Sequence, residues 1–262
     1  MRQKIYQVDA FSQEPFKGNP AAVCVLEQWL SEEKMQLIAM ENNLSETAFV
    51  VPMGDEYEIR WFTPLVEVDL CGHATLASAH VLFEYYNHKG KEILFQSRKK
   101  GALTVVKDKK LGLVLDFPAQ QIVPIQPHDS ISKAIGATPK KTIKGETDFM
   151  LVFENQAQVA ALKPNFEELA KTKARGIIAT APGKEVDFVS RFFGPACGVN
   201  EDPVTGSAHT TLTPYWSKKL NKNKLHAFQL SKRGGVLFCE EKGDRVIIGG
   251  QAVQYLEGKI AF

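Results

Sequence analysis

Two short stretches of the sequence place acidic, hydroxyl and imidazole groups beside glycines, each where an apolar helical segment begins. They are CGHATL (71–76) and EDPVTGSAH (201–209). The residues in them that could do chemistry are Gly72, His73, Asp202, Gly206 and Ser207. The first N–H groups of a helix have no partner within it, and the helix dipole adds about half a positive charge at that end. Because such an end attracts carboxylate or phosphate, both stretches predict binding of a small anion.

A third stretch, NNLSETAFV (42–50), places Glu46 after Ser45 where an apolar strand begins. A carboxyl group at the edge of a buried strand can have a raised pKa, which suits proton transfer near neutral pH. The same residue could instead cap a turn or end an exposed strand. His73 could pass a proton or only cap its helix. Asp202 and Ser207 are open to the same capping interpretation, and the proline after Asp202 favours an extended backbone there.

The sequence also repeats itself in order. The matching pairs are RWFTP (60–64) with RFFGP (191–195), CGHATL (71–76) with TGSAHTTL (205–212), and FQSRKKGALTVV (95–106) with FQLSKRGGVLFC (228–239). Three matches at nearly equal spacing indicate two copies of one unit. The sequence therefore predicts two domains, 1–118 and 119–262, and allows the last strand to return to the first domain.

Each copy contains many short apolar strands and one clear central helix, at 73–87 and at 206–220. Several strands follow one another through short turns, which argues against a doubly wound parallel sheet. We expect an α+β fold in which each domain is a mixed, mostly antiparallel, barrel-like sheet around its helix. The segment 119–131 contains two prolines and little periodicity, and it is predicted to be a linker.

The composition excludes several classes of protein. Lys and Arg total 32 and Asp and Glu total 30, and the net charge of +2 gives no case for nucleic-acid binding. The four cysteines form no CxxC pair and the N-terminus has no signal-peptide pattern, so a cytoplasmic protein with reduced thiols is expected. No run approaches the roughly 20 apolar residues of a membrane span, so no membrane partner is expected. Nucleotide-binding, serine-hydrolase and zinc-protease motifs are absent, and no cofactor or metal is implied.

Four ordered motifs resemble the PhzF-like isomerases of phenazine biosynthesis, within the diaminopimelate epimerase superfamily. The motifs are VDAFSQEPFKGNPAAV (8–23), LSETAFV (44–50), EVDLCGHATLASAHVL (67–82) and NEDPVTGSAH (200–209). The resemblance implies the two-domain fold, an active site in the cleft between the domains, a homodimer, and no metal or organic cofactor. It also implies catalytic roles for Glu46, His73 and Asp202. Substrate binding would fall to Ser45, Gly72, Gly206 and Ser207.

These observations predict an isomerase that moves a proton on a small carboxylate-bearing metabolite by general acid–base catalysis. One alternative is an epimerase or racemase that uses Glu46 with Cys71, which precedes the first helix start. The racemases of the superfamily use two opposed cysteines, and here the counterpart of Cys71 is Thr205, which disfavours a two-thiol mechanism. The other alternative is a non-catalytic protein that binds a small anion on the same fold.

Overall fold

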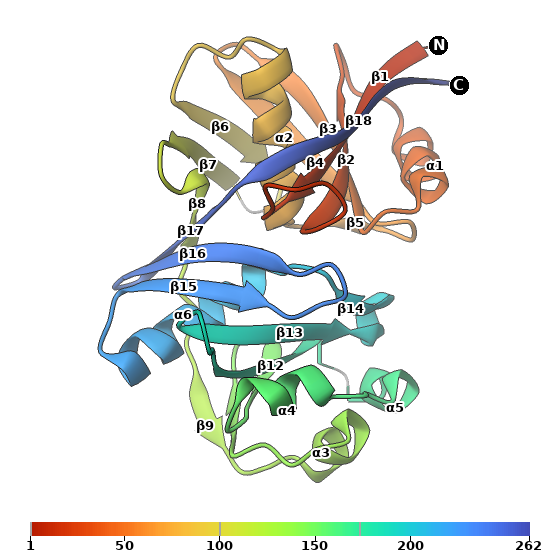
Figure 1. Ribbon diagram of the computed structural model, residues 1–262. Helices are drawn as coiled ribbons and strands as arrows, with labels where there is room; N and C mark the ends of the chain where they lie inside the picture. The colour runs from red at the N-terminus through yellow and green to blue at the C-terminus, as the bar shows by residue number, and fades with distance from the viewer. Residues whose placement is uncertain (1, 100, 173) are drawn as a thin grey trace. The chain divides into compact units, whose positions relative to one another are not determined.

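The structure of the protein, a computed structural model, describes residues 2–99, 101–172 and 174–262. It contains two compact units: unit 1 is formed by Met1–Asp116 together with Gly249–Phe262, and unit 2 by Phe117–Ile248. Figure 1 shows both ends of the chain in unit 1, where the dark blue last strand runs beside the red first strand. Unit 1 is therefore built from two separate parts of the sequence.

Unit 1 combines a mixed sheet with two helices. Its elements in chain order are β1 (Arg2–Ala10), β2 (Asn19–Val25), α1 (Glu32–Asn42), β3 (Glu46–Met53), β4 (Glu56–Phe62), β5 (Glu67–Val68), α2 (Gly72–Tyr85), β6 (Glu92–Ser97), β7 (Gly101–Asp108), β8 (Gly112–Pro118) and β18 (Ala252–Ala261). β1 pairs antiparallel with both β2 and β18. β2–β3 and β4–β6 are parallel, and β3–β4, β4–β5, β6–β7 and β7–β8 are antiparallel.

α2 is the central helix of unit 1. Ten of its 14 residues are buried, and they are mostly small, so strands can pack close to the helix. A helix that is apolar on every side belongs in a core. Its two buried hydroxyl side chains, Thr75 and Ser78, donate to the carbonyls of Cys71 and Ala74 at 2.6 and 2.7 Å. These bonds leave neither hydroxyl unsatisfied in the core.

Unit 2 repeats this arrangement. Its elements are β9 (Val123–Ile125), α3 (Asp129–Ile135), β10 (Lys141–Lys144), β11 (Asp148–Val152), α4 (Gln156–Ala161), α5 (Phe166–Ala170), β12 (Gly176–Pro182), β13 (Phe188–Gly194), η1 (Pro195–Cys197), β14 (Val199–Asp202), α6 (Gly206–Leu220), β15 (Lys224–Gln229), β16 (Gly235–Lys242) and β17 (Arg245–Gly250). β11–β12 and β13–β15 are parallel, as β2–β3 and β4–β6 are, and β12–β13 is antiparallel, as β3–β4 is. The predicted α+β fold with an internal repeat is confirmed.

One alignment within the predicted repeat is wrong by one residue. The sequence matches FQS (95–97) with FQL (228–230), but β6 and β15 share the same burial pattern only when Ser97 corresponds to Gln229. The parallel pairings with β4 and β13 give the same alignment. Because side chains alternate between the faces of a strand, a shift of one residue would exchange core and surface residues. The burial pattern therefore determines how β6 and β15 align, and the alignment suggested by sequence similarity is off by one residue.

The predicted linker, 119–131, is also wrong, because this segment is part of unit 2. It contains β9, which pairs antiparallel with β10, and the beginning of α3. It is tied to α6 as well. Pro214 lies inside that helix and has no N–H, so the carbonyl of Thr210 lacks its usual partner. The N–H of Gln120 donates to that carbonyl at 3.1 Å.

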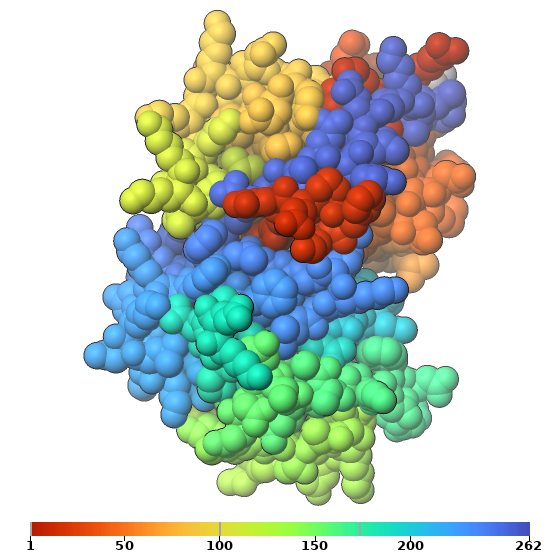
Figure 2. Space-filling view, viewed as in Figure 1, coloured from red at the N-terminus to blue at the C-terminus, as the bar shows by residue number. Residues whose placement is uncertain are grey.

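The surface of unit 1 brings distant parts of the sequence together. Figure 2 shows the red loop after β1 lying against the blue residues of the last strand. Phe16 and Tyr255 meet there edge to face, with ring centroids 5.4 Å apart. Among the residues that the structure describes, none of the helices combines the length and apolar character of a membrane span.

Candidate functional site

Glu46 lies at the beginning of β3, and its side chain is 17% exposed. It faces Ala21 in the parallel pair with β2, and the four residues after it are buried. Ser45, immediately before the strand, is half-buried. The Oε2 atom of Glu46 lies 3.2 Å from Nε2 of His73. Two residues predicted from separate motifs therefore meet within unit 1.

His73 is held on both sides of its ring. The ring's Nδ1 lies 3.2 Å from the side-chain amide nitrogen of Asn19 and 3.4 Å from Sγ of Cys71. The amide N–H donates to Nδ1, so the proton of the neutral ring is on Nε2, the nitrogen that faces Glu46. The imidazole thus contacts a carboxylate through Nε2 and a thiol through Nδ1.

Burial also sets the charge of His73. Because the imidazolium form would be removed from water, burial lowers the pKa of His73 to about 3. At neutral pH the ring is uncharged, and it offers an N–H group without a positive charge. Glu46 is therefore the group of this pair that can take a proton from a substrate.

Asn19 was not identified from the sequence. The only signal was the turn KGNP (17–20), in which Gly18 has a φ of 67°. A Cβ at Gly18 would lie 2.2 Å from the carbonyl oxygen of Ala10, so the turn requires glycine. This turn places Asn19 at the first position of β2, where it reaches His73 from the neighbouring part of the sheet.

The central helices begin in the same way in both units. Neither N-cap residue, Cys71 for α2 or Thr205 for α6, caps its helix with its side chain. The first-turn N–H groups that follow, from Gly72 and from Gly206, are the kind of group that binds an anion. The structure thus provides a helix start of the predicted type in each unit.

The start of α6 is held by a buried glutamine that the sequence reasoning missed. Gln229 accepts a hydrogen bond from the N–H of Thr205 at 2.9 Å and donates to the carbonyl of Asp202 at 2.8 Å. The carboxylate of Asp202 accepts from the hydroxyl of Thr205 at 2.5 Å. These bonds fix the orientation of Asp202 relative to the helix start.

A fixed positive charge stands beside the same helix. Nη1 of Arg175 donates to the hydroxyl of Ser207 at 3.2 Å. The guanidinium also binds both carboxylate oxygens of Asp148, whose side chain is fully buried, and lies 5.4 Å from the ring centroid of Phe192. Neither Arg175 nor Asp148 belongs to a motif, so the sequence offered no signal for them.

The predicted site residues therefore fall into two groups. Unit 1 holds Ser45, Glu46, Gly72 and His73, and unit 2 holds Asp202, Gly206 and Ser207. In the first group Glu46 and His73 are in contact. In the second group Asp202 and Ser207 flank the start of α6, and each is oriented by a different neighbour, Thr205 and Arg175.

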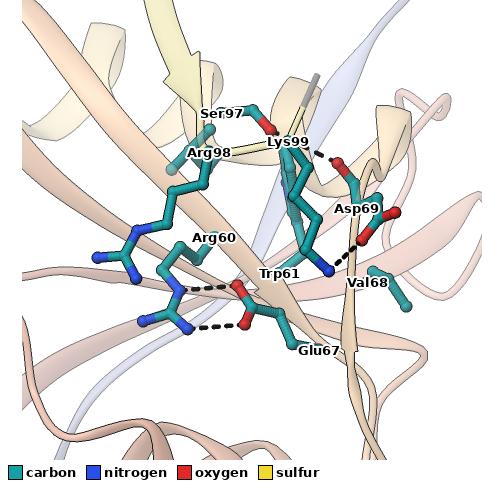
Figure 3. Close-up of a pocket in the computed structure, with 9 residues that line it drawn as sticks. Arg60, Trp61, Glu67, Val68, Asp69, Ser97, Arg98 and Lys99 are labelled. Atoms are coloured by element: carbon teal, nitrogen blue, oxygen red, sulfur yellow. Dashed lines mark hydrogen bonds and ion pairs between the residues drawn. The ribbon is translucent and has the colours of Figure 1, made fainter. Parts of the chain in front are cut away.

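A small pocket in unit 1 lies apart from these residues. Its charged lining residues, drawn in Figure 3, are Arg60, Glu67, Asp69, Arg98 and Lys99. Arg60 binds Glu67 through two nitrogens at 2.7 Å each, and Lys99 binds Asp69 at 2.7 Å. Arg98 binds Glu58 at 2.9 Å. Because each cation of the pocket is already paired with a carboxylate, the pocket is a less suitable place for an anionic substrate than the helix starts.

Comparisons with known proteins identify the family. The sequence profile described as phenazine biosynthesis-like protein (PhzC-PhzF) matches residues 8–258. The chain belongs to this family. An uncharacterized isomerase of Pseudomonas aeruginosa is 53% identical to it over 99% of both chains. A crystal structure of a PhzF family protein from Enterococcus faecalis is 49% identical, covers both chains completely and superposes with a TM-score of 0.94.

The protein also shares its fold with structures of very low sequence identity. A hydroxyproline epimerase from Agrobacterium vitis has only 8% identity, yet it superposes with a TM-score of 0.68 over 99% of this chain and 92% of its own. This likeness shows the fold alone. The family match and the relatives named isomerases identify the protein as a PhzF-like enzyme of the isomerase type, and the superposition shows only that the epimerase shares its fold.

Proposed function

We propose that this PhzF-like protein moves a proton within a small carboxylate-bearing metabolite by general acid–base catalysis, without a cofactor. The observation that supports the proposal most directly is the 3.2 Å contact between Glu46 and a neutral His73 at the uncapped start of α2. The carboxylate of Glu46, the N–H group of the His73 ring and the first backbone N–H groups of α2 thus lie close together in space.

In the proposed reaction the substrate carboxylate lies against N–H groups of the helix starts, at Gly72 and Gly206. Glu46 removes a proton from carbon, and the negative charge that develops on the substrate is stabilised by these N–H groups. The protonated Glu46 then returns the proton to another carbon of the same molecule. One such acid–base group typically contributes about 10²–10⁴ in rate.

The other residues orient the substrate in this proposal. His73 donates its Nε2 proton to a substrate oxygen or to the Glu46 carboxylate. Asp202 and Ser207 bind polar groups of the substrate from unit 2, and Ser45 does so beside Glu46.

The test is solvent exchange at carbon. The protein is incubated in D₂O with a panel of small acids that carry an acidic C–H near the carboxylate, and deuterium is located by mass spectrometry and NMR. With the substrate found in this way, Glu46→Gln is expected to lower the rate by about 10²–10⁴. Glu84→Gln, at a surface residue paired with Lys107, is the matched control and should retain the rate. Turnover by Glu46→Gln within a few-fold of wild type would refute the mechanism.

An epimerase mechanism is the second candidate, because Cys71 belongs to the same cluster as Glu46 and His73. Deuterium would then enter a stereocentre with inversion, and Cys71→Ser would abolish the exchange. Retention of exchange in Cys71→Ser favours the proton shift. Ligand-induced stabilisation without any exchange would instead indicate a binding protein.

A further inference from the structure

We propose that Glu46, Cys71 and His73 form a binding site for a thiophilic divalent ion such as Zn²⁺, and that the bound ion blocks the proposed proton transfer. The binding half of this inference stands on the geometry of unit 1. The blocking half rests on the proposed role of Glu46.

The three side chains are close enough to share one ion. One ligand atom from each lies within 4.8 Å of those of the other two. Zinc binds cysteine sulfur at about 2.3 Å and histidine nitrogen or carboxylate oxygen at about 2.0–2.2 Å, so tetrahedral ligand atoms lie about 3.4–3.7 Å apart. Glu46 Oε2 and His73 Nε2, 3.2 Å apart, nearly meet that spacing already. Sγ of Cys71, which lies 3.4 Å from Nδ1 of the same ring, has to turn towards Nε2 to complete the set.

The ligand chemistry also selects the ion. Thiolate and imidazole favour zinc and similar transition metals, whereas magnesium and calcium require oxygen ligands. Two anionic ligands, the carboxylate and the thiolate, outweigh the half positive charge at the start of α2.

The residue behind His73 suits the same role. A histidine that binds a metal through one nitrogen usually donates its other N–H to an oxygen. The Asn19 amide lies 3.2 Å from Nδ1, and a half-turn of the amide group would present its oxygen to an Nδ1 proton. His73 would then bind the ion through Nε2, the nitrogen that faces Glu46.

Three ligands leave a tetrahedral ion with one open position, as in catalytic zinc sites. In this protein an ion bound to Glu46 occupies the lone pair that the proposed reaction uses. The ion is therefore expected to act as an inhibitor.

The experiment is a titration of the metal-free protein with Zn²⁺ by calorimetry and with Co²⁺ by absorbance, where a thiolate ligand gives a charge-transfer band. We expect one ion per chain. Cys71→Ser should lower the affinity at least tenfold and remove the band, and Glu46→Gln should lower the affinity while keeping the band. Cys197→Ser, at the exposed cysteine of unit 2, is the matched control and should match wild type.

If circular dichroism shows that Cys71→Ser does not fold, a second variant still tests the site. Asn19→Leu removes the partner of His73 and should weaken binding about 10–100-fold while keeping the band. Absence of saturable binding by the wild type, unchanged affinity in Cys71→Ser, or loss in Cys197→Ser would overturn the site. Unaltered exchange by the zinc-loaded enzyme would overturn the blocking half alone. Exchange that depends on Glu46 without zinc binding would leave the proposed function standing and remove this inference.

Discussion

The two units place opposite charges beside corresponding helix starts. In unit 1 the carboxylate of Glu46 lies 3.2 Å from His73, the residue after Gly72. In unit 2 the guanidinium of Arg175 lies 3.2 Å from Ser207, the residue after Gly206. The same backbone arrangement thus holds a carboxylate in one copy and a guanidinium in the other.

The strand pairings show that these positions correspond. In both β3 and β12 a proline follows six positions after the first residue of the strand. The second residue of each strand pairs with a phenylalanine of the next strand, Phe62 in β4 and Phe193 in β13. Glu46 therefore corresponds to Gly176, and Ser45 corresponds to Arg175. The charged residue is the first residue of the strand in unit 1, Glu46, and the residue immediately before the strand in unit 2, Arg175.

The ring of Phe192 explains why the second copy has no side chain at this place. A Cβ at Gly176 would lie 2.1 Å from the nearest ring atom of Phe192. The ring fills the space, and Arg175 stacks on it. The difference between the units is thus one of packing as well as charge, and packing can be tested separately.

The largest expected effect comes from removing the cation. Arg175→Met leaves the Asp148 carboxylate buried without its partner, and loss of one member of a buried pair costs several kcal/mol. Because Arg175 is itself 36% exposed, we expect the low end, about 3 kcal/mol of unfolding free energy in urea at pH 7.5. Glu46→Gln, the corresponding change in unit 1, should cost less than about 1 kcal/mol.

The pH dependence of that variant sharpens the test. Burial raises the pKa of Asp148, and without Arg175 only the hydrogen bonds from Thr147 and from the backbone of Gly176 oppose this effect. The folded chain then binds a proton more readily than the unfolded chain, so folding is favoured as pH falls. The deficit of Arg175→Met should therefore shrink from pH 7.5 to pH 5. An equal deficit at both pH values would mean that the loss comes from packing on Phe192.

The second prediction compares the residues that hold the two helix starts. Gln229→Ala removes three bonds to the loop before α6, including one to the hydroxyl of Thr205, and leaves a buried N–H and a carbonyl to find other partners, at a cost of about 2 kcal/mol. Ser97, its counterpart, donates to the carbonyl of Asp69 at a long 3.5 Å. Ser97→Ala should cost less than about 1 kcal/mol, measured in the same urea series. Equal costs would contradict the unequal support that we describe.

The third prediction concerns the packing at Gly176. Gly176→Ala forces the Phe192 ring to move, which should cost about 1.5 kcal/mol as overpacking. Phe192→Leu should make room, so the alanine should cost almost nothing in that background. The measurement is a double-mutant cycle on unfolding free energies. Additive costs would show that Phe192 is not what excludes a side chain from this position.

The smallest effect concerns the buried histidines near the helix starts. Burial lowers the pKa of His209 to about 4, as it lowers that of His73. The unfolded chain takes up a proton near pH 6.5 while the folded chain resists, so stability falls as pH drops below that value. His209→Gln should remove about 1 kcal/mol of the loss between pH 6.5 and 5.5. A pH profile parallel to that of the wild type would contradict the low pKa.

The fold class and the candidate residues in the motifs could be predicted from the sequence because both depend on local patterns. The repeat, the central helices and the strands follow from periodicity, and Glu46 and His73 lie in short motifs. Asn19, Gln229 and Arg175 could not be predicted in this way. Asn19 and Gln229 lie in stretches that the sequence singles out, but nothing in those stretches indicates their hydrogen-bond partners, and Arg175 lies in no motif. The register error at β6 and β15 has the same origin, because similar letters do not record which side of a strand faces the core.

The pairing of β1 with β18 has a consequence for how the chain is made. Because a protein is synthesised from its N-terminal side, β1 leaves the ribosome long before β18, its second neighbour in the sheet. During that interval the first strand presents an open edge, the kind of surface that promotes aggregation. Joining the two adjacent termini by a short peptide and opening the chain elsewhere would let β18 be synthesised directly before β1, and would shorten that exposure.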